Sequence, residues 1–289
     1  MSMNAVASIF QGDVKLAGDF CDQEWASRLS LSSGVLQVLD AHKGIRYAHN
    51  AFVPRDDWRA LHDDELAWLT RGVVPNIDRT GTVYLDRFVM PDFSELRDVA
   101  KRYGVAAARR FTESPAMRQA VSDARARADD LFVNAAPLRA LGISVSEPGL
   151  CTSSMEMPPV RKYVGLHIDQ WSDDETVTKS TASRLSINIG NEARYFLAIN
   201  MTLPAMRQLL GQQDGDGRLV ALRFLSKFAD FPVLRIKIEP GEGYLAMARN
   251  LIHDATSTDM QGIDLSLSFL GEFLNDSPWH ERRERALQS

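Results

Sequence analysis

The spacing of hydrophobic and polar residues differs between the two halves of the chain. Within the first 150 residues, the stretches 44–53 and 81–90 alternate and carry β-branched and aromatic side chains, so they predict strands. Residues 92–111 and 114–132 instead repeat apolar positions every three or four residues, which predicts helices. We therefore expect residues 1–150 to form a mixed, helix-rich N-terminal region that packs on the rest of the protein.

After about residue 150 the pattern changes to short strand-like runs separated by Gly, Asn, Asp and Pro. The runs cover residues 160–169, 183–190, 193–200, 217–225, 231–239, 243–249 and 262–273. One predicted helix, residues 203–210 with Thr202 as its N-cap, interrupts them. Many short strands with one helix among them favour two stacked sheets over a parallel sheet with alternating helices. The predicted fold class is α+β with a mainly β core, a jelly roll over residues 151–276, followed by a polar tail at 277–289.

The composition narrows the class of protein. A net charge of −5 and a sequence pI of about 5.7 argue against a protein built mainly to bind nucleic acid. No apolar run approaches the roughly 18 residues needed to cross a bilayer, and the N-terminus shows no secretory signal. The two cysteines, Cys21 and Cys151, have no CxxC spacing. These features predict a soluble cytoplasmic protein without nucleic-acid or membrane partners.

The sequence "GLHIDQW" at residues 165–171 contains the strongest candidate for a metal site. Residues i and i+2 of a strand point to the same side, so His167 and Asp169 would project together into a barrel. A third ligand would complete a face of two histidines and one carboxylate. Such a face leaves open positions and favours non-haem Fe(II) with O₂ chemistry. A zinc hydrolase fits a similar ligand set.

The chain has six histidines, and one of them suits the third ligand position. His253 lies in a late strand-like region, and the second and seventh strands of an eight-stranded jelly roll are neighbours. The other candidates lie before the predicted core or in the polar tail: His42, His49, His62 and His280. We therefore predict that His167, Asp169 and His253 bind one metal ion.

Three stretches together resemble the Fe(II)/2-oxoglutarate-dependent dioxygenase superfamily: "GLHID", "PGEGYLAMARNLIHDATS" and "GIDLSLSFLGEF". The turn that precedes the apolar strand and His253 is most similar to the JmjC-type and asparaginyl-hydroxylase branch. The resemblance covers about residues 150–273. It implies a double-stranded β-helix core of the cupin-like kind, Fe(II) bound by the triad, and 2-oxoglutarate and O₂ as co-substrates.

The resemblance also implies a cation for the distal carboxylate of 2-oxoglutarate. Many members carry an arginine about ten residues after the last histidine, but here Asp264 stands roughly at that position and no Lys or Arg is near it. The JmjC-type branch instead places a lysine on a strand after the HxD segment, where this chain offers Arg194 and Arg184. Arg194 is the first choice, because it opens its strand directly after a Gly-Asn turn, the position most like the family's lysine, and Arg184 is the second. A guanidinium can bind a carboxylate through two parallel hydrogen bonds, which a lysine cannot.

Further side chains share the strand phase of these residues. Asn188 and Ser268 would face the barrel and could bind 2-oxoglutarate, or they could be satisfied polar groups of the core. Arg161, Tyr163 and Trp171 flank the HxD pair and are candidates for substrate contacts, although for Trp171 ordinary packing is the favoured explanation.

The sequence thus predicts a non-haem iron, 2-oxoglutarate-dependent oxygenase. By resemblance, the carboxylate ligand Asp169 favours hydroxylation over halogenation, with desaturation or cyclisation left open. A small-molecule substrate, an amino acid or a natural-product metabolite, suits the modestly acidic chain, and a peptide side chain stays open. The alternative is a metal-binding, cupin-like isomerase or ligand sensor that does not use 2-oxoglutarate.

Overall fold

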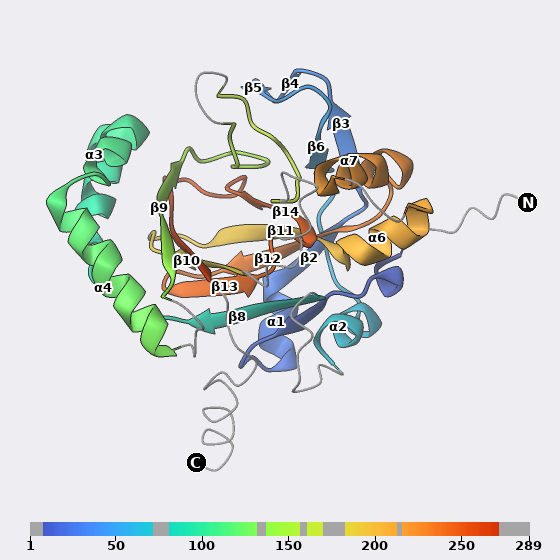
Figure 1. Cartoon of the computed structure of the whole chain (residues 1–289), viewed down its shortest axis with the longest axis horizontal. Coiled ribbons are helices and arrows are strands. Elements are labelled where there is room, and N and C mark those ends of the chain that lie inside the picture. Colours follow the sequence, from blue (N-terminus) through green and yellow to red (C-terminus); the bar gives the residue numbers. More distant parts are fainter. Residues whose placement is uncertain are drawn as a thin grey trace, which may run out of the picture.

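The computed structural model describes residues 8–71, 81–131, 137–156, 161–169, 183–212 and 216–271. This part of the chain is a mixed α/β structure with a sheet-rich core, in which two large sheets lie against each other and helices cover their outer faces (Figure 1). The arrangement is consistent with the predicted jelly roll.

The larger sheet has six strands and the smaller has five. In spatial order, the larger contains β1 (Lys15–Ala17), β8 (Thr82–Arg87), β13 (Glu242–Ala246), β10 (Ser183–Asn188), β15 (Asp264–Gly271) and β9 (Arg139–Ser146). The smaller contains β14 (Leu251–Thr256), β11 (Arg194–Thr202), β12 (Val233–Ile238), β2 (Leu29–Ser32) and β7 (Arg59–Ala60). Two short hairpins pair β3 (Val35–Val38) with β6 (Ala51–Pro54) and β4 (Ala41–His42) with β5 (Ile45–Arg46).

The hydrophobic core has three main layers. Between the two sheets, Val83, Leu85 and Ala246 pack with Phe196, Leu234 and Ile236 of the opposite sheet. Helices α3 (Ser94–Phe111) and α4 (Pro115–Leu131) cover the outer face of the larger sheet (Figure 1). Helices α6 (Leu203–Leu210) and α7 (Gly217–Lys227) cover the outer face of the smaller sheet. The N-terminal part adds helices α1 (Asp22–Arg28) and α2 (Asp63–Thr70) and the 3₁₀ turn η1 (Ile9–Gln11).

Several predicted elements are confirmed. The helices expected at 92–111 and 114–132 are α3 and α4, and the helix expected at 203–210 is α6 with Thr202 at its N-cap. The Thr202 hydroxyl contacts the carboxylate of Asp13 at 2.6 Å instead of capping its own helix. The strand expected at 81–90 is β8.

The strand predicted at 217–225 is wrong, because these residues form helix α7. Val220, Ala221 and Phe224 are buried at helical spacing on the outer face of the smaller sheet. The carboxylate of Asp216 accepts a hydrogen bond from the amide of Arg218 at 2.8 Å, which caps the first turn. The run is apolar enough to suit either element, and tertiary packing with α6 selects the helix.

The N-terminal half contributes strands to both sheets of the core, in addition to its helices. Strands β1, β8 and β9 extend the larger sheet, and β2 and β7 extend the smaller one. The domain division at residue 150 remains a prediction, and the polar tail at 277–289 lies outside the described residues. Within the described ranges, no helix combines the length and apolar character needed to cross a membrane.

The acidic turn that contributes to the family resemblance has a structural role. Glu242 is buried at the start of β13, and its carboxylate accepts hydrogen bonds from the Arg28 guanidinium at 2.6 and 3.0 Å. The amide of Glu239 donates to the same carboxylate at 2.9 Å. This contact fastens the end of α1 to the turn that leads toward the strand of His253.

Candidate metal centre

The structure brings the three predicted ligands together. One ligand atom from each of His167, Asp169 and His253 lies within 4.8 Å of the others. His167 and His253 are partners in an antiparallel bridge, where their backbone amides donate to each other's carbonyls at 3.1 and 2.8 Å. The expectation that the two histidines come from neighbouring segments is therefore met.

The local alternation explains why His167 and Asp169 face this site. Their neighbours Leu166 and Ile168 are buried in the outer core with α6 and α7. Gly165 permits the segment to lie close to β6, because a Cβ atom at this position would meet the carbonyl oxygen of Phe52 at 2.5 Å. The segment 161–169 is held by isolated bridges, so the regular strand predicted at 160–169 is not formed there.

Backbone carbonyls fix the orientation of both imidazoles. Nδ1 of His167 lies 2.8 Å from the carbonyl oxygen of Gly165, and Nδ1 of His253 lies 3.0 Å from that of Leu251. A carbonyl can only accept, so each Nδ1 carries a proton and donates it. Each Nε2 is then the nitrogen available to a metal ion.

Asp169 lies between cationic partners. Nη2 of Arg184 is 2.7 Å from its Oδ2, and Nε2 of His167 is 3.5 Å from its Oδ1. Burial alone would raise the pKa of Asp169. Its neighbours His167, His253 and Arg184 outweigh this effect and hold that pKa well below the usual range. The carboxylate is therefore ionised at neutral pH, as a metal ligand must be.

The two histidines differ in their affinity for protons. Burial lowers the pKa of His253 to about 4. Burial also opposes protonation of His167, but the carboxylates of Asp169 and Asp254 raise its pKa to about 10. At neutral pH the site without a metal ion therefore holds one imidazolium, on His167, beside a neutral imidazole.

The donor set fits a divalent metal ion. Nε2 of His253 is buried and has no hydrogen-bond partner among the described residues, although an imidazole nitrogen in a core is normally paired. A nitrogen of His167, an oxygen of Asp169 and a nitrogen of His253 all lie within 4.8 Å of one another. Three protein ligands leave coordination positions for other molecules.

Asp254 is part of this site, and the sequence analysis did not find it. Its carboxylate is fully buried, and Oδ2 lies 3.6 Å from Nδ1 of His167. Oδ1 accepts from the amides of Ser153 and Ser154 at 3.2 and 3.1 Å and from the Ser154 hydroxyl at 3.0 Å. Strand alternation places Asp254 on the face opposite His253, so the pattern gave no reason to associate it with the metal ligands.

A row of hydroxyl groups crosses the larger sheet inside the core. Ser186 of β10 is the register partner of Tyr244 in β13 and of Ser268 in β15. The Ser268 hydroxyl lies 3.2 Å from that of Ser186. Ser268 thus faces inward as predicted, and Ser186 and Tyr244 lie beside it.

Arg194 reaches the same row but already has a protein carboxylate as its partner. Its Nε and Nη2 donate to Asp264 at 2.8 and 3.2 Å, and its Nη1 donates to the Ser186 hydroxyl at 3.3 Å. The Asp264 carboxylate raises the pKa of Arg194 against the effect of burial. The aromatic pair Phe196 and Tyr244, whose ring centroids are 4.0 Å apart, lies next to this row, and the Phe196 ring is 5.9 Å from that of His253.

Asn188 has contacts that assign it to the protein core. Its amide nitrogen donates to the carbonyls of Glu192 and Ile238 at 2.8 and 2.9 Å, and its oxygen accepts from the amide of Gly190 at 2.9 Å. The side chain therefore fixes the turn between β10 and β11. Of the two roles left open by the sequence, these contacts describe the satisfied polar group.

Neither Arg161 nor Tyr163, the two described candidates for substrate contacts, packs against the triad. Arg161 is exposed, and Tyr163 packs on Tyr47 with ring centroids 6.0 Å apart, in a small cluster beneath the β3–β6 hairpin. Trp171 lies outside the described residues. The substrate-binding roles of these three residues remain predictions.

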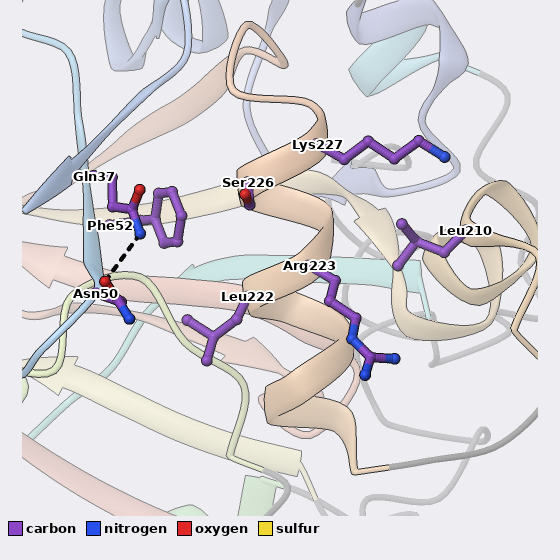
Figure 2. Close-up of a pocket in the computed structure, with 8 residues that line it drawn as sticks. All are labelled: Gln37, Asn50, Phe52, Leu210, Leu222, Arg223, Ser226 and Lys227. Carbon is purple, nitrogen blue, oxygen red and sulfur yellow. Dashed lines mark hydrogen bonds between the residues drawn. The ribbon is translucent and has the colours of Figure 1, made fainter.

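A surface pocket of about 510 Å³ lies elsewhere, between the β3–β6 hairpin and helices α6 and α7 (Figure 2). On one side Gln37 donates to Asn50 at 3.2 Å, and on the other Arg223 and Lys227 extend from α7 (Figure 2). No ligand of the triad lines this pocket.

The comparisons with known proteins are sparse. No family model and no curated protein matches the chain. The chain is similar to three solved structures of the Kdo hydroxylase KdoO, a non-heme Fe(II) alphaketoglutarate dependent dioxygenase, in complex with succinate and Fe(III), in complex with cobalt(II), and as an apo structure. Each match is 12% identical and covers 67% of this chain and 80% of that chain, with TM-scores of 0.35, 0.36 and 0.37. Because these scores lie below 0.5, the likeness does not establish a shared activity.

Proposed function

We propose that this protein is an Fe(II)- and 2-oxoglutarate-dependent oxygenase that hydroxylates a small molecule. The observation that carries the proposal is the convergence of His167, Asp169 and His253, with both Nδ1 protons held by carbonyls and Nε2 of His253 left without a partner among the described residues. A bound Fe(II) would supply coordination positions for 2-oxoglutarate and O₂ beside three protein ligands.

The protein's own groups would hold the metal and exclude water around it. Both imidazoles donate through Nδ1, so each would bind the ion through Nε2, that of His167 after it loses its second proton, and Asp169 is already ionised. His253 lies within the core beside Phe196, so the wall of the site on that side is apolar. An apolar wall strengthens the electrostatic interactions of a charged site because few water molecules screen them.

For the distal carboxylate of 2-oxoglutarate, Arg194 remains our first choice. Its Nη1 points at the hydroxyl row of Ser186 and Ser268, which could donate further hydrogen bonds to the same carboxylate. Asp264 would then hold the guanidinium in place. Arg184 is the second choice, since it is the cation next to Asp169 and could exchange that partner for a co-substrate carboxylate.

The substrate class is supported by composition alone. The net charge of −5 is unsuited to a nucleic-acid substrate, and we propose an amino acid or a small natural-product metabolite. The ligand Asp169 supports hydroxylation as the outcome, because a protein carboxylate occupies the position that a halide would otherwise need.

The experiment measures succinate formed from 2-oxoglutarate by protein loaded with Fe(II), with panels of amino acids and metabolites added. We expect basal succinate release that rises when the right substrate is present. His253→Ala should abolish it, whereas His49→Ala, which changes an exposed histidine outside the site, should not. Equal turnover by wild type and His253→Ala would refute the assignment of the triad.

One observation favours a second candidate function. Asp264 neutralises the charge of Arg194. The region beside the hydroxyl row is therefore less positive than a site that binds the distal carboxylate of 2-oxoglutarate is expected to be. A cupin-like isomerase or ligand sensor would keep the metal triad and need no cation there. Metal binding without any consumption of 2-oxoglutarate, under all conditions of the substrate screen, would favour this candidate.

A further inference from the structure

A second carboxylate lies next to the proposed metal ligand His167. It is neither one of the three proposed ligands nor a proposed contact of 2-oxoglutarate. Asp254 directly follows His253 in β14, and its side chain is fully buried. Its Oδ2 has no hydrogen-bond partner among the described residues, yet it lies 3.6 Å from Nδ1 of His167. A carboxylate oxygen in the interior is normally paired, so its place beside the ring of His167 points to a role there.

The other oxygen of Asp254 is fixed by the preceding segment of the chain. Oδ1 accepts from the amides of Ser153 and Ser154, from the Ser154 hydroxyl and from the amide of Ala255, which lies 2.6 Å away. Several donors on one oxygen set the orientation of the carboxylate. Oδ2 is thereby kept at the ring edge of His167 and cannot turn away to another donor.

We infer that Asp254 is a positioning residue for the metal ligand His167, an inference that rests on the proposed metal site. The Nδ1 proton of His167 lies between the carbonyl of Gly165 at 2.8 Å and the Asp254 carboxylate. A negative charge on this side of the ring holds the proton on Nδ1, keeps Nε2 directed at Asp169 and His253, and makes Nε2 a stronger donor to a metal ion. At the corresponding nitrogen of His253, the partner among the described residues is the carbonyl of Leu251, at 3.0 Å.

The test is Asp254→Asn, which preserves the size of the side chain. Its amide oxygen can still accept from Ser153 and Ser154, but its NH₂ group would face the Nδ1 proton of His167, donor against donor. We expect the affinity for Co(II) alone, titrated into the metal-free full-length protein, to fall about 10–100-fold. The thermal stability of the metal-free protein is the second readout. If Asp254 served only to anchor residues 153–154, the substitution would lower this stability and leave the Co(II) affinity unchanged.

Glu242→Gln is the matched control. It makes the same carboxylate-to-amide change at another buried position, where the partners are Arg28 and the Glu239 amide. It should reduce stability and leave the Co(II) affinity as in the wild type. Asp254→Asn with wild-type Co(II) affinity would overturn the inference. A wild-type protein that fails to bind Co(II) would instead contradict the proposed metal site itself.

A spectroscopic comparison within the wild-type protein covers the case in which Asp254→Asn does not fold. In the Zn(II)-loaded protein, the Nδ1 protons of His167 and His253 should both give exchangeable proton signals. Both Nδ1 protons face a backbone carbonyl, and that of His167 also has the Asp254 carboxylate 3.6 Å away, so its signal should lie downfield of that of His253. Signals at the same position, or in the reverse order, would overturn the role of Asp254.

Discussion

Arg194 and Asp264 form a buried ion pair in which Nε and Nη2 of the guanidinium donate to the two carboxylate oxygens at 2.8 and 3.2 Å. The arginine starts β11 and the aspartate starts β15, so the pair joins the two sheets at one end of the core. Asp264 stands where many members of the resembled family have an arginine. In this chain β11 supplies a cation and β15 supplies the anion that pairs with it. The third nitrogen of the guanidinium, Nη1, donates to the Ser186 hydroxyl.

Asp264→Asn tests whether this arginine binds the co-substrate. The amide oxygen can still accept from Arg194, while the negative charge that would repel a distal carboxylate is removed. If Arg194 is the anchor, the Michaelis constant for 2-oxoglutarate should fall several-fold, since about 1.4 kcal/mol of relieved repulsion corresponds to tenfold in affinity. Steady-state succinate assays measure this constant. An unchanged constant, together with a raised one in Arg184→Met, would transfer the role to Arg184.

The same pair should matter for stability. Arg194→Met leaves Asp264 buried without its partner, which should lower the free energy of unfolding by about 3–5 kcal/mol. The double variant Arg194→Met/Asp264→Leu removes both charges and should recover most of this loss, because an apolar pair needs no compensation. Denaturant unfolding of the metal-free proteins gives both values. A single variant as stable as the wild type would show that the pair is solvated and contributes little.

Arg184 competes with a metal ion for Asp169, because its Nη2 lies 2.7 Å from Oδ2 of that ligand. Arg184→Met should therefore bind Co(II) about tenfold more tightly, which corresponds to about 1.4 kcal/mol of relieved competition. Arg161→Met, which removes an exposed cation from the preceding segment, should leave the affinity unchanged. Weaker Co(II) binding by Arg184→Met would mean that the arginine orients Asp169 for the metal instead of competing with it.

Metal binding should depend on pH through His167. Its pKa of about 10 means that the metal-free site holds a proton on this ring at neutral pH, whereas His253, with a pKa of about 4, is already neutral. A metal ion must displace the His167 proton, so binding at about pH 7.5 should release about one proton. The Co(II) affinity should then rise by about tenfold per pH unit between about pH 6.5 and 8.5.

Proton release in weakly buffered solution, measured by an indicator dye during the Co(II) titration, checks this expectation. The sign follows from the raised pKa: rising pH removes the competing proton and favours the metal. An affinity that does not change with pH would show that His167 is neutral before the metal binds.

The sequence was sufficient to predict that His167, Asp169 and His253 lie close together. His167 and Asp169 share a strand phase, and His253 is the histidine that lies in a late strand, so simple alternation and topology bring them together. The same rule placed Ser268 on the inner face. Helices α3, α4 and α6 were predicted because their apolar positions recur at helical spacing with caps or turns at the ends.

The other features of the site and the fold depend on contacts between distant residues, which leave no pattern in the nearby sequence. Asp254 lies out of phase with His253, and its partners Ser153 and Ser154 are far away in the sequence. The pairing of Arg194 with Asp264 joins strands of different sheets, across 70 positions of the sequence. The segment 217–225 is apolar enough for a strand, and packing of α7 on the outer face of the smaller sheet made it a helix.

The most direct test of the central claim is an anaerobic titration of the Fe(II)-loaded protein with 2-oxoglutarate, followed by visible absorption. Chelation of Fe(II) by the keto acid in a site with open positions gives a charge-transfer band that neither component shows alone. We predict that the band appears in the wild type and saturates at one 2-oxoglutarate per iron, but is absent in His253→Ala. An iron-loaded wild type without the band, or an equal band in His253→Ala, would contradict the account.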